Sequence, residues 1–272
     1  MTRRYVIPAL LMTFVILLAV PALAQGGVQA IGACTIIDKP GSYVLASDIK
    51  ATVGDLKWAA PGRFTGACIV IVADFVSLDL QGHTIAGPQA FENPNNAGIY
   101  TTADASDKQP TAAQIRNGCV TGFMAGIAVE GTGHMVERMR VAGNIAGMTL
   151  RGNGTKVKEV MAVSNQDQGI LWFGNYGVSV EDCQVTSNGW MGIQQWDPDE
   201  YGEALGSRIV GNTVSGNALY GIYAHCPSVI LQNMVYKNGS DQDGWHDIVL
   251  VPGSSDCTLS DNNPVVPEYQ GP

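Results

Sequence analysis

Three acidic residues, Asp197, Asp199 and Glu200, lie close together in the polar insertion 194–206. Two carboxyl groups placed on either side of a glycosidic bond can hydrolyse it, one as the acid and the other as the base or nucleophile. A polysaccharide lyase needs a base for the proton beside a uronate and a group that stabilises the carboxylate. His225 and Arg151 are residue types that fill these roles. These five residues are the candidate catalytic groups, and the alternative is that the acids form only a solvated loop.

Aromatic residues recur near the same positions of the chain as these polar groups. Phe173, Trp196 and Tyr223 each follow a Gly-aliphatic pair by a few residues. If they share one outward face, their rings would form a strip on which sugar rings stack, with Arg151 and His225 beside it. The opposing interpretation is that the aromatic rings pack beneath the insertions and bind nothing.

Three further aspartates, Asp241, Asp243 and Asp247, lie in a second polar segment, 238–247. Calcium takes several carboxylate and carbonyl oxygens from a flexible loop. The segment is compatible with such a site, but it lacks the full twelve-residue pattern with its closing glutamate. Ca²⁺ is therefore the one cofactor that the sequence suggests, and a solvated loop is the alternative.

The elements that position these residues follow from an internal repeat. A glycine followed by an aliphatic residue recurs every 21–29 residues, and a second series of apolar residues ends each time in an asparagine. Repeats of this length indicate a solenoid. The Gly-aliphatic pairs begin at Gly98, Gly126, Gly147, Gly169, Gly192 and Gly221, with Asp247-Ile248 as a degenerate seventh. The asparagines are Asn144, Asn165, Asn188, Asn217 and Asn238.

The repeat predicts strands rather than helices, because its apolar residues alternate, are often β-branched and occur in short runs broken by Gly and Asn. About three short strands per coil would stack at roughly 4.8 Å, so that equivalent residues of successive coils form inward columns. One expected column runs from Ile127 to Ile248 and another from Val141 to Val235. The asparagines are expected at bends, where they tolerate left-handed geometry and bond to the asparagine of the next coil.

Two passages carry a family resemblance: CIVIVADFVSLDLQGHTIAGP, residues 68–88, and IRNGCVTGFMAGIAV, residues 115–129. They resemble the opening coils of secreted bacterial right-handed parallel β-helix proteins of the pectate-lyase-like superfamily. The resemblance implies an all-β, single-stranded right-handed parallel β-helix of about seven to nine coils. It is specific for the fold and uninformative about function, because this fold carries many unrelated activities. The catalytic motifs of polygalacturonases and pectate lyases are not found, so no family catalytic residue carries over.

Residues 1–24 have the pattern of a signal peptide: two arginines, an apolar run, and Ala22-Leu23-Ala24 before the expected cleavage point. We therefore expect a secreted or periplasmic protein with no membrane span after cleavage. The mature chain divides into an entry with first coils (25–97), regular coils (98–263) and a Pro-containing tail (264–272). In an exported protein, Cys34 and Cys68 are expected to form a disulfide that staples the first coil. A pairing of Cys226 with Cys257 remains open.

The formal net charge is −9. Nucleic acid is a disfavoured partner, since phosphate contacts need a basic face. We expect a monomer that binds or processes a polysaccharide or cell-surface glycan on the face of the Gly-Ile strands. Two alternatives stay open: a non-catalytic structural or adhesive solenoid, and a periplasmic accessory protein resembling the β-helix group that matures copper enzymes. The last of these lacks the expected Cys/His/Met ligand cluster.

Overall fold

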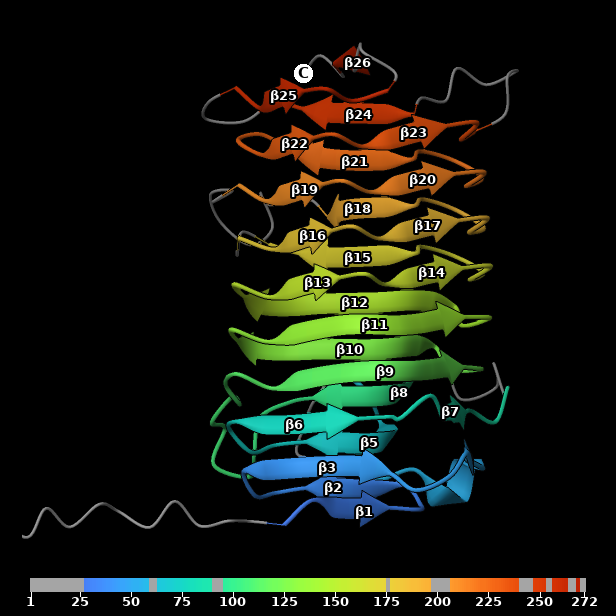
Figure 1. Ribbon diagram of the computed structural model, residues 1–272, viewed down its shortest axis with the longest axis vertical. Coiled ribbons are helices and arrows are strands. Elements are labelled where there is room, and N and C mark those ends of the chain that lie inside the picture. The colour runs from blue at the N-terminus through green and yellow to red at the C-terminus, as the bar shows by residue number, and fades with distance from the viewer. Residues whose placement is uncertain are drawn as a thin grey trace, which may run out of the picture.

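The computed structural model describes residues 27–58, 63–89, 95–174, 177–196, 206–239, 247–252, 256–263 and 268–269. The expected signal peptide, 1–24, lies outside these ranges. Within the described part the chain is almost entirely β-strand, with a single 3₁₀ turn at Val53–Asp55. The coils stack in chain order along one long axis, from β1 at one end to β25 and β26 at the other (Figure 1). Among the described residues, no helix is long and apolar enough to cross a membrane.

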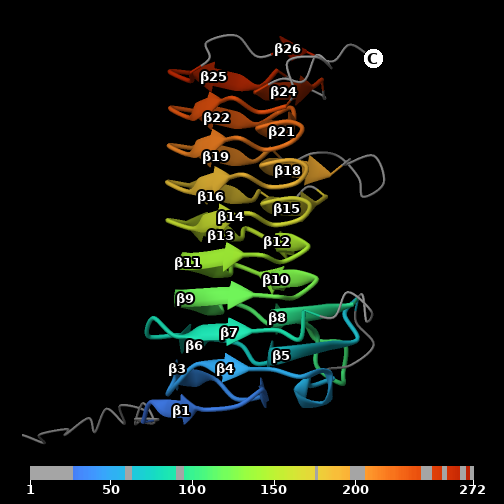
Figure 2. The same ribbon diagram turned by 90° about the vertical axis from the view of Figure 1, so that its right-hand side faces the viewer.

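Two sheets form the walls of the stack, and every pair of strands in them is parallel. Figure 2, turned by 90°, shows the two walls on opposite sides of the coils. The ten-stranded sheet is consistent with the expected number of coils. Its strands, in spatial order, are β2 (Thr35–Ile37), β5 (Gly66–Ile71), β8 (Asn96–Thr101), β10 (Ala125–Thr132), β12 (Ala146–Asn153), β15 (Ile170–Phe173), β18 (Ile193–Trp196), β21 (Ile222–His225), β24 (Ile248–Val251) and β26 (Glu268–Tyr269).

The sixteen-stranded sheet is bent, so that most coils, early and late, contribute two strands to it. Its main path is β1 (Gln29–Ile31), β3 (Gly41–Leu45), β6 (Val76–Asp79), β9 (Gln114–Thr121), β11 (Met135–Ala142), β13 (Lys156–Lys158), β16 (Ser179–Glu181), β19 (Arg208–Val210), β22 (Val229–Leu231) and β25 (Thr258–Ser260). Beside it lie β4 (Ile49–Lys50), β7 (Thr84–Ala86), β14 (Met161–Val163), β17 (Gln184–Thr186), β20 (Thr213–Ser215) and β23 (Met234–Tyr236).

Both expected inward columns are present. Ile127 pairs in register with Met148, and the column continues in register to Ile248. The second column, from Val141 to Val235, is also in register and fully buried. These columns belong to one continuous apolar core that runs the length of the stack. Parallel pairing places like residues above one another, so each coil covers the apolar surface of the next.

The glycine that precedes the aliphatic residue has a steric cause. A Cβ atom added at Gly192 would lie 2.6 Å from the carbonyl oxygen of Gly221 and 2.7 Å from Nδ2 of Asn217. Such distances are far shorter than any normal contact, and one of the two partners is backbone. Equivalent contacts, with the next coil and with an asparagine amide, occur at Gly126, Gly147, Gly169 and Gly221.

The asparagines form the expected ladder. Asn165 is typical: its backbone N–H and its Nδ2 both donate to Oδ1 of Asn188, at 3.1 and 2.9 Å, and Nδ2 also donates to the carbonyl oxygen of Val141. The expectation of left-handed geometry at these asparagines is wrong. The preceding residue has the positive φ instead, for example Ser164 at 52° and Ser187 at 56°. That bend turns the asparagine side chain into the interior, where its amide satisfies buried backbone groups.

A second asparagine ladder follows the other bend of the coil. The backbone N–H of Cys183 donates to Oδ1 of Asn212 at 2.9 Å, and Asn212 bonds in the same way to Asn233 and Asn233 to Asn262. Cys183 itself is a buried core residue, and burial raises the pKa of its thiol to about 12. A buried thiol with so high a pKa carries almost no reactive thiolate at neutral pH.

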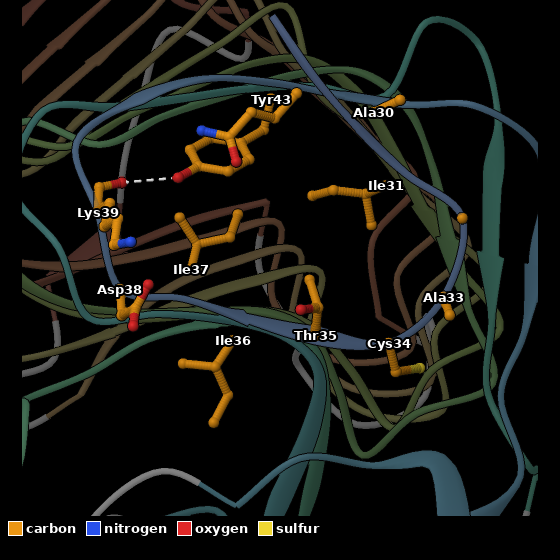
Figure 3. Close-up of a pocket in the computed structure, with 12 residues that line it drawn as sticks. Ala30, Ile31, Ala33, Cys34, Thr35, Ile36, Ile37, Asp38, Lys39 and Tyr43 are labelled. Atoms are coloured by element: carbon orange, nitrogen blue, oxygen red, sulfur yellow. Dashed lines mark hydrogen bonds between the residues drawn. The ribbon is translucent and has the colours of Figure 1, made fainter. Parts of the chain in front are cut away.

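Both ends of the described stack carry a disulfide. Cys34 is joined to Cys68, the pairing expected from the sequence, and Cys226 is joined to Cys257. At the first coil a hollow of about 410 Å³ opens among inward side chains, and Tyr43 extends across it to donate a hydrogen bond to the carbonyl oxygen of Lys39 at 2.9 Å (Figure 3). This hollow is the end of the core, partly closed by a tyrosine. At the other end, β26 pairs with β24, so the tail adds a strand that the proline-rich sequence did not indicate.

Candidate binding groove on the ten-stranded sheet

The outer face of the ten-stranded sheet carries three of the predicted site residues in adjacent coils. Pairing of Phe173 with Trp196 places their rings 5.9 Å apart between centroids, tilted by 35°. One coil earlier, the guanidinium carbon of Arg151 lies 3.9 Å from the centre of the Phe173 ring. That distance is typical of a cation–π contact. Arg151, Phe173 and Trp196 therefore form a continuous row, as the sequence predicted, but the arginine already occupies one side of Phe173.

A cavity of about 420 Å³ lies against this row. Three aromatic residues of this face, Phe173, Trp190 and Trp196, belong to its lining. Arg63 reaches the same place from the loop before β5, with its guanidinium carbon 5.3 Å from the centre of the Phe173 ring. A concave site with several aromatic walls and a few polar groups is the usual form of a small-ligand site.

Asp167 is the acidic residue of this cavity lining. It lies in the bend between β14 and β15, where its backbone N–H donates to Ile145 and its carbonyl oxygen accepts from Trp190. These two bonds fix the residue between the coils below and above it. Burial raises the pKa of the Asp167 carboxyl, because the charged form loses hydration among the apolar walls.

Tyr223 and His225 lie in a separate cluster. The Tyr223 ring stacks on Tyr220 at 5.6 Å with an interplanar angle of 19°, and it meets the His225 ring edge-on at 5.6 Å. These tyrosines pack with Met191 and Val249 in an apolar cluster outside the main core. His225 is 6 % exposed. The described rings of the expected strip thus form two adjoining groups. Tyr223 and His225 do not line the cavity, but Trp190, which does, also packs against the Tyr220 cluster.

In the early coils, residues on the outward side of the ten-stranded sheet are also covered rather than exposed. Tyr100 and Ala128 each follow the inward aliphatic residue of a Gly-aliphatic pair and so lie on the outward side of the sheet, yet both are almost fully buried. The ring of Phe64 lies over Tyr100, with centroids 5.1 Å apart, in an apolar cluster that includes Ala128. Phe64, two residues before β5, therefore covers this part of the outer face.

The remaining predicted site residues divide into two groups. Asp197, Asp199, Glu200, Asp241 and Asp243 lie outside the described residues, so their catalytic or calcium roles stay predictions. Asp247 is described, and its Oδ1 accepts bonds from the backbone N–H and Nδ2 of Asn238 at 3.0 and 2.8 Å. This aspartate ends the asparagine ladder. Within the described ranges, no three His, Cys, Asp or Glu side chains converge as a metal site.

Asp167 and Trp190 were missed by the sequence reasoning, although a signal existed. Each stands two residues after a ladder asparagine, in the bend that precedes a Gly-aliphatic pair. Ala146 and Leu219 hold the equivalent positions in neighbouring coils. Placing the two repeat phrases in one register would have shown these outward positions. Arg63 offered no such signal, because it belongs to an irregular loop.

Comparisons with known proteins agree with the fold. The family model described as right handed beta helix region matches residues 125–266, while a search of curated proteins found no match. Among solved structures, the chain is similar to the Dettilon tailspike protein (gp208), with a TM-score of 0.60 and 14 % identity over 86 % of this chain and 54 % of that one. The chain thus spans about half the length of the tailspike.

Two further similarities are weaker. The periplasmic alginate epimerase AlgG matches with a TM-score of 0.42 and 12 % identity, over 84 % of this chain and 76 % of that one. Pectate lyase Pel9A matches with a TM-score of 0.38 and 17 % identity, over 82 % of this chain and 70 % of that one. At these identities the similarities concern the fold alone.

Proposed function

Because the chain belongs to the right-handed β-helix family, we propose that it binds a polysaccharide through the cavity on its ten-stranded sheet. The observation that carries this proposal is the joint presence of Trp190, Trp196 and Asp167 around one cavity of about 420 Å³. Indole rings offer flat apolar surfaces for the C–H faces of a sugar ring, and a carboxylate accepts hydrogen bonds from its hydroxyl groups.

The proposal includes export from the cytoplasm. Two disulfides, Cys34–Cys68 and Cys226–Cys257, support it, because disulfides persist mainly in oxidising compartments. The pattern of residues 1–24 supports it independently. An exported glycan-binding protein would meet its ligand at the cell surface or in the periplasm.

Binding is tested by titrating the protein with neutral and uronate-rich polysaccharides, with and without Ca²⁺, by calorimetry. We expect Trp196→Ala to weaken binding by about tenfold or more, since a buried tryptophan contact is commonly worth more than 1 kcal/mol. Trp190→Ala should act in the same direction. The control is Tyr236→Ala, which removes an exposed ring from β23 on the other sheet. Unchanged binding in both tryptophan variants would refute the proposed site.

Cleavage is followed in the same samples through new reducing ends and unsaturated products. Activity that disappears in Asp197→Ala or Asp199→Ala, with binding retained, would identify a polysaccharide-cleaving enzyme and the role of the insertion. Binding without cleavage would identify a lectin-like protein.

A second candidate function is a non-catalytic structural or adhesive solenoid. The packing of Tyr220 and Tyr223 favours it, because these rings stack on each other in an apolar cluster with Met191 and Val249. Lack of binding to every polysaccharide in the panel would support this second candidate over the first.

A further inference from the structure

The carboxyl group of Asp167 is half-buried in the cavity wall among apolar and aromatic side chains. Within the described ranges of the chain, no side chain or backbone N–H donates a hydrogen bond to it, and no cation pairs with it. A carboxylate in such surroundings loses hydration without gaining a partner, which costs free energy. The group is therefore prepared to accept hydrogen bonds from a ligand that enters the cavity.

The chemistry of the ligand follows from what a carboxylate can accept. Its two oxygens take hydrogen bonds side by side, and charge-assisted bonds of this kind are the stronger ones. Adjacent hydroxyl groups on a sugar ring present two donors at a suitable spacing. Trp190 and Trp196 line the same cavity and can cover the apolar faces of that ring.

Charge separates neutral from acidic sugars at this position. A uronate would bring a second negative charge beside the half-buried Asp167, where the repulsion is screened less than at the surface. Arg151 lies outside the cavity lining, with its guanidinium against the Phe173 ring. Arg63, the cation of the lining, is exposed and lies against the same ring. Its attraction for an anion is consequently weakened by solvent.

We propose that Asp167 selects a neutral sugar unit in this cavity by accepting hydrogen bonds from two adjacent hydroxyls, while Trp190 and Trp196 cover the ring. This inference rests on the proposed polysaccharide binding and specifies its substrate class. The ionised carboxylate is the binding form, because the protonated acid is a poorer acceptor. Burial raises the pKa of Asp167. Binding should therefore weaken as the pH falls through the pKa of this carboxyl group.

The test measures dissociation constants for tetrasaccharides of glucose, mannose and galactose, and for tetragalacturonate and tetramannuronate, using the full chain. At least one neutral ligand should bind about tenfold more tightly than the uronates. Asp167→Asn should weaken the binding of that neutral ligand by about tenfold. It should also narrow the difference in dissociation constant between the neutral ligand and the uronates. The wild-type affinity should fall between pH 7 and pH 4, and that of Asp167→Asn should change much less.

Two controls separate this inference from the proposed function. Asp38→Asn removes an exposed carboxylate from the first coil and should change nothing. If Trp196→Ala abolishes binding but Asp167→Asn leaves it unchanged, or if uronates bind more tightly, the selection by Asp167 is refuted and polysaccharide binding stands. If no ligand in the panel binds, both proposals are refuted.

Discussion

His134 is buried between β10 and β11, and its Nδ1 accepts a hydrogen bond from the backbone N–H of Ala113 at 3.0 Å. The ring must therefore be neutral at Nδ1 for this bond to exist. Burial lowers the pKa of His134 below its usual value. The residue has a structural role: it attaches the chain before β9 to the following coil.

The lowered pKa of His134 predicts a loss of stability in mild acid. Between the folded pKa and the unfolded value of about 6.5, the unfolded chain binds a proton that the folded chain does not. The free energy of unfolding should therefore decrease as the pH falls from 7 to 5, by about 1.4 kcal/mol for each unit of pKa difference. Urea unfolding at several pH values measures this.

The matched variant for this experiment is His134→Asn, whose side-chain oxygen can accept the same hydrogen bond but does not titrate. The difference between the two stability curves isolates His134 from carboxyl groups such as Asp167, whose raised pKa acts in the opposite direction. Curves that stay parallel from pH 7 to pH 5 would contradict the prediction.

At the scale of single coils, the Gly-Ile start and the ladder asparagine are one structural unit. The glycine brings the backbone of one coil close to the amide of an asparagine and to the carbonyl oxygen of the next glycine. The asparagine uses that space to satisfy buried backbone groups at the bend. Their joint recurrence in the sequence is therefore the signature of tight coil stacking.

Gly192→Ala tests this unit. The added Cβ would overlap the Gly221 carbonyl oxygen, which is backbone, and the Asn217 amide, which is held by hydrogen bonds to Val185 and Asn238. We expect a loss of about 2 kcal/mol or more in the free energy of unfolding, because overpacking in a well-packed core typically costs 1–3 kcal/mol. Gly32→Ala is the control, since no atom lies within 4 Å of an added Cβ there. Equal effects of the two substitutions on thermal unfolding would disprove the steric explanation.

The row of aromatic residues is interrupted between β18 and β21. β18 and β21 pair only through Ile193–Ile222 and Gln194–Tyr223. Beyond that point the backbone N–H of His225 donates to the side-chain oxygen of Gln195, at 3.1 Å. At this point the side-chain amide of a buried glutamine takes the place of a backbone hydrogen bond between the two strands. The insertion that follows Trp196 begins directly beyond it in the sequence. This local departure accompanies the separation of Trp196 from the Tyr223 cluster.

At the scale of the whole molecule, stability depends on neighbours along the stack. Each coil of a solenoid contacts only the coils beside it, so the ends have fewer contacts than the middle. The two disulfides lie in these end regions: Cys34–Cys68 joins the first coils, and Cys226–Cys257 joins β21–β22 to the segment before β25. They compensate for the missing neighbour.

Removing the second disulfide should loosen one end of the molecule selectively. In the double variant Cys226→Ser, Cys257→Ser, we expect faster amide hydrogen exchange in β24 and β25 and little change in β12 and β15. A disulfide of this loop length commonly contributes about 2–4 kcal/mol. Cys119→Ser, which removes a free cysteine, is the control. Uniformly faster exchange along the stack would mean that the molecule unfolds as one unit instead.

The Cys34–Cys68 pairing was predicted from the expected export of the chain. The sequence by itself also determined the fold, the inward columns and the asparagine ladder. These features follow from the period, because parallel stacking places equivalent residues above one another and buries the same position in every coil. Val141, Val185 and Val235 could therefore be assigned to the core from their spacing alone. The row Arg151–Phe173–Trp196 followed from the same register.

Only the tertiary structure decided which outward positions are accessible. Tyr100 has the same register as Tyr223, yet the loop carrying Phe64 covers the first, while Tyr220 and Met191 pack around the second. Asp167 and Trp190 line the cavity because bends of successive coils meet an irregular loop there. The repeat determines the inside of the solenoid, since each coil is packed by its copy. The outside depends on loops that do not repeat, so spacing alone does not reveal which of its side chains they cover.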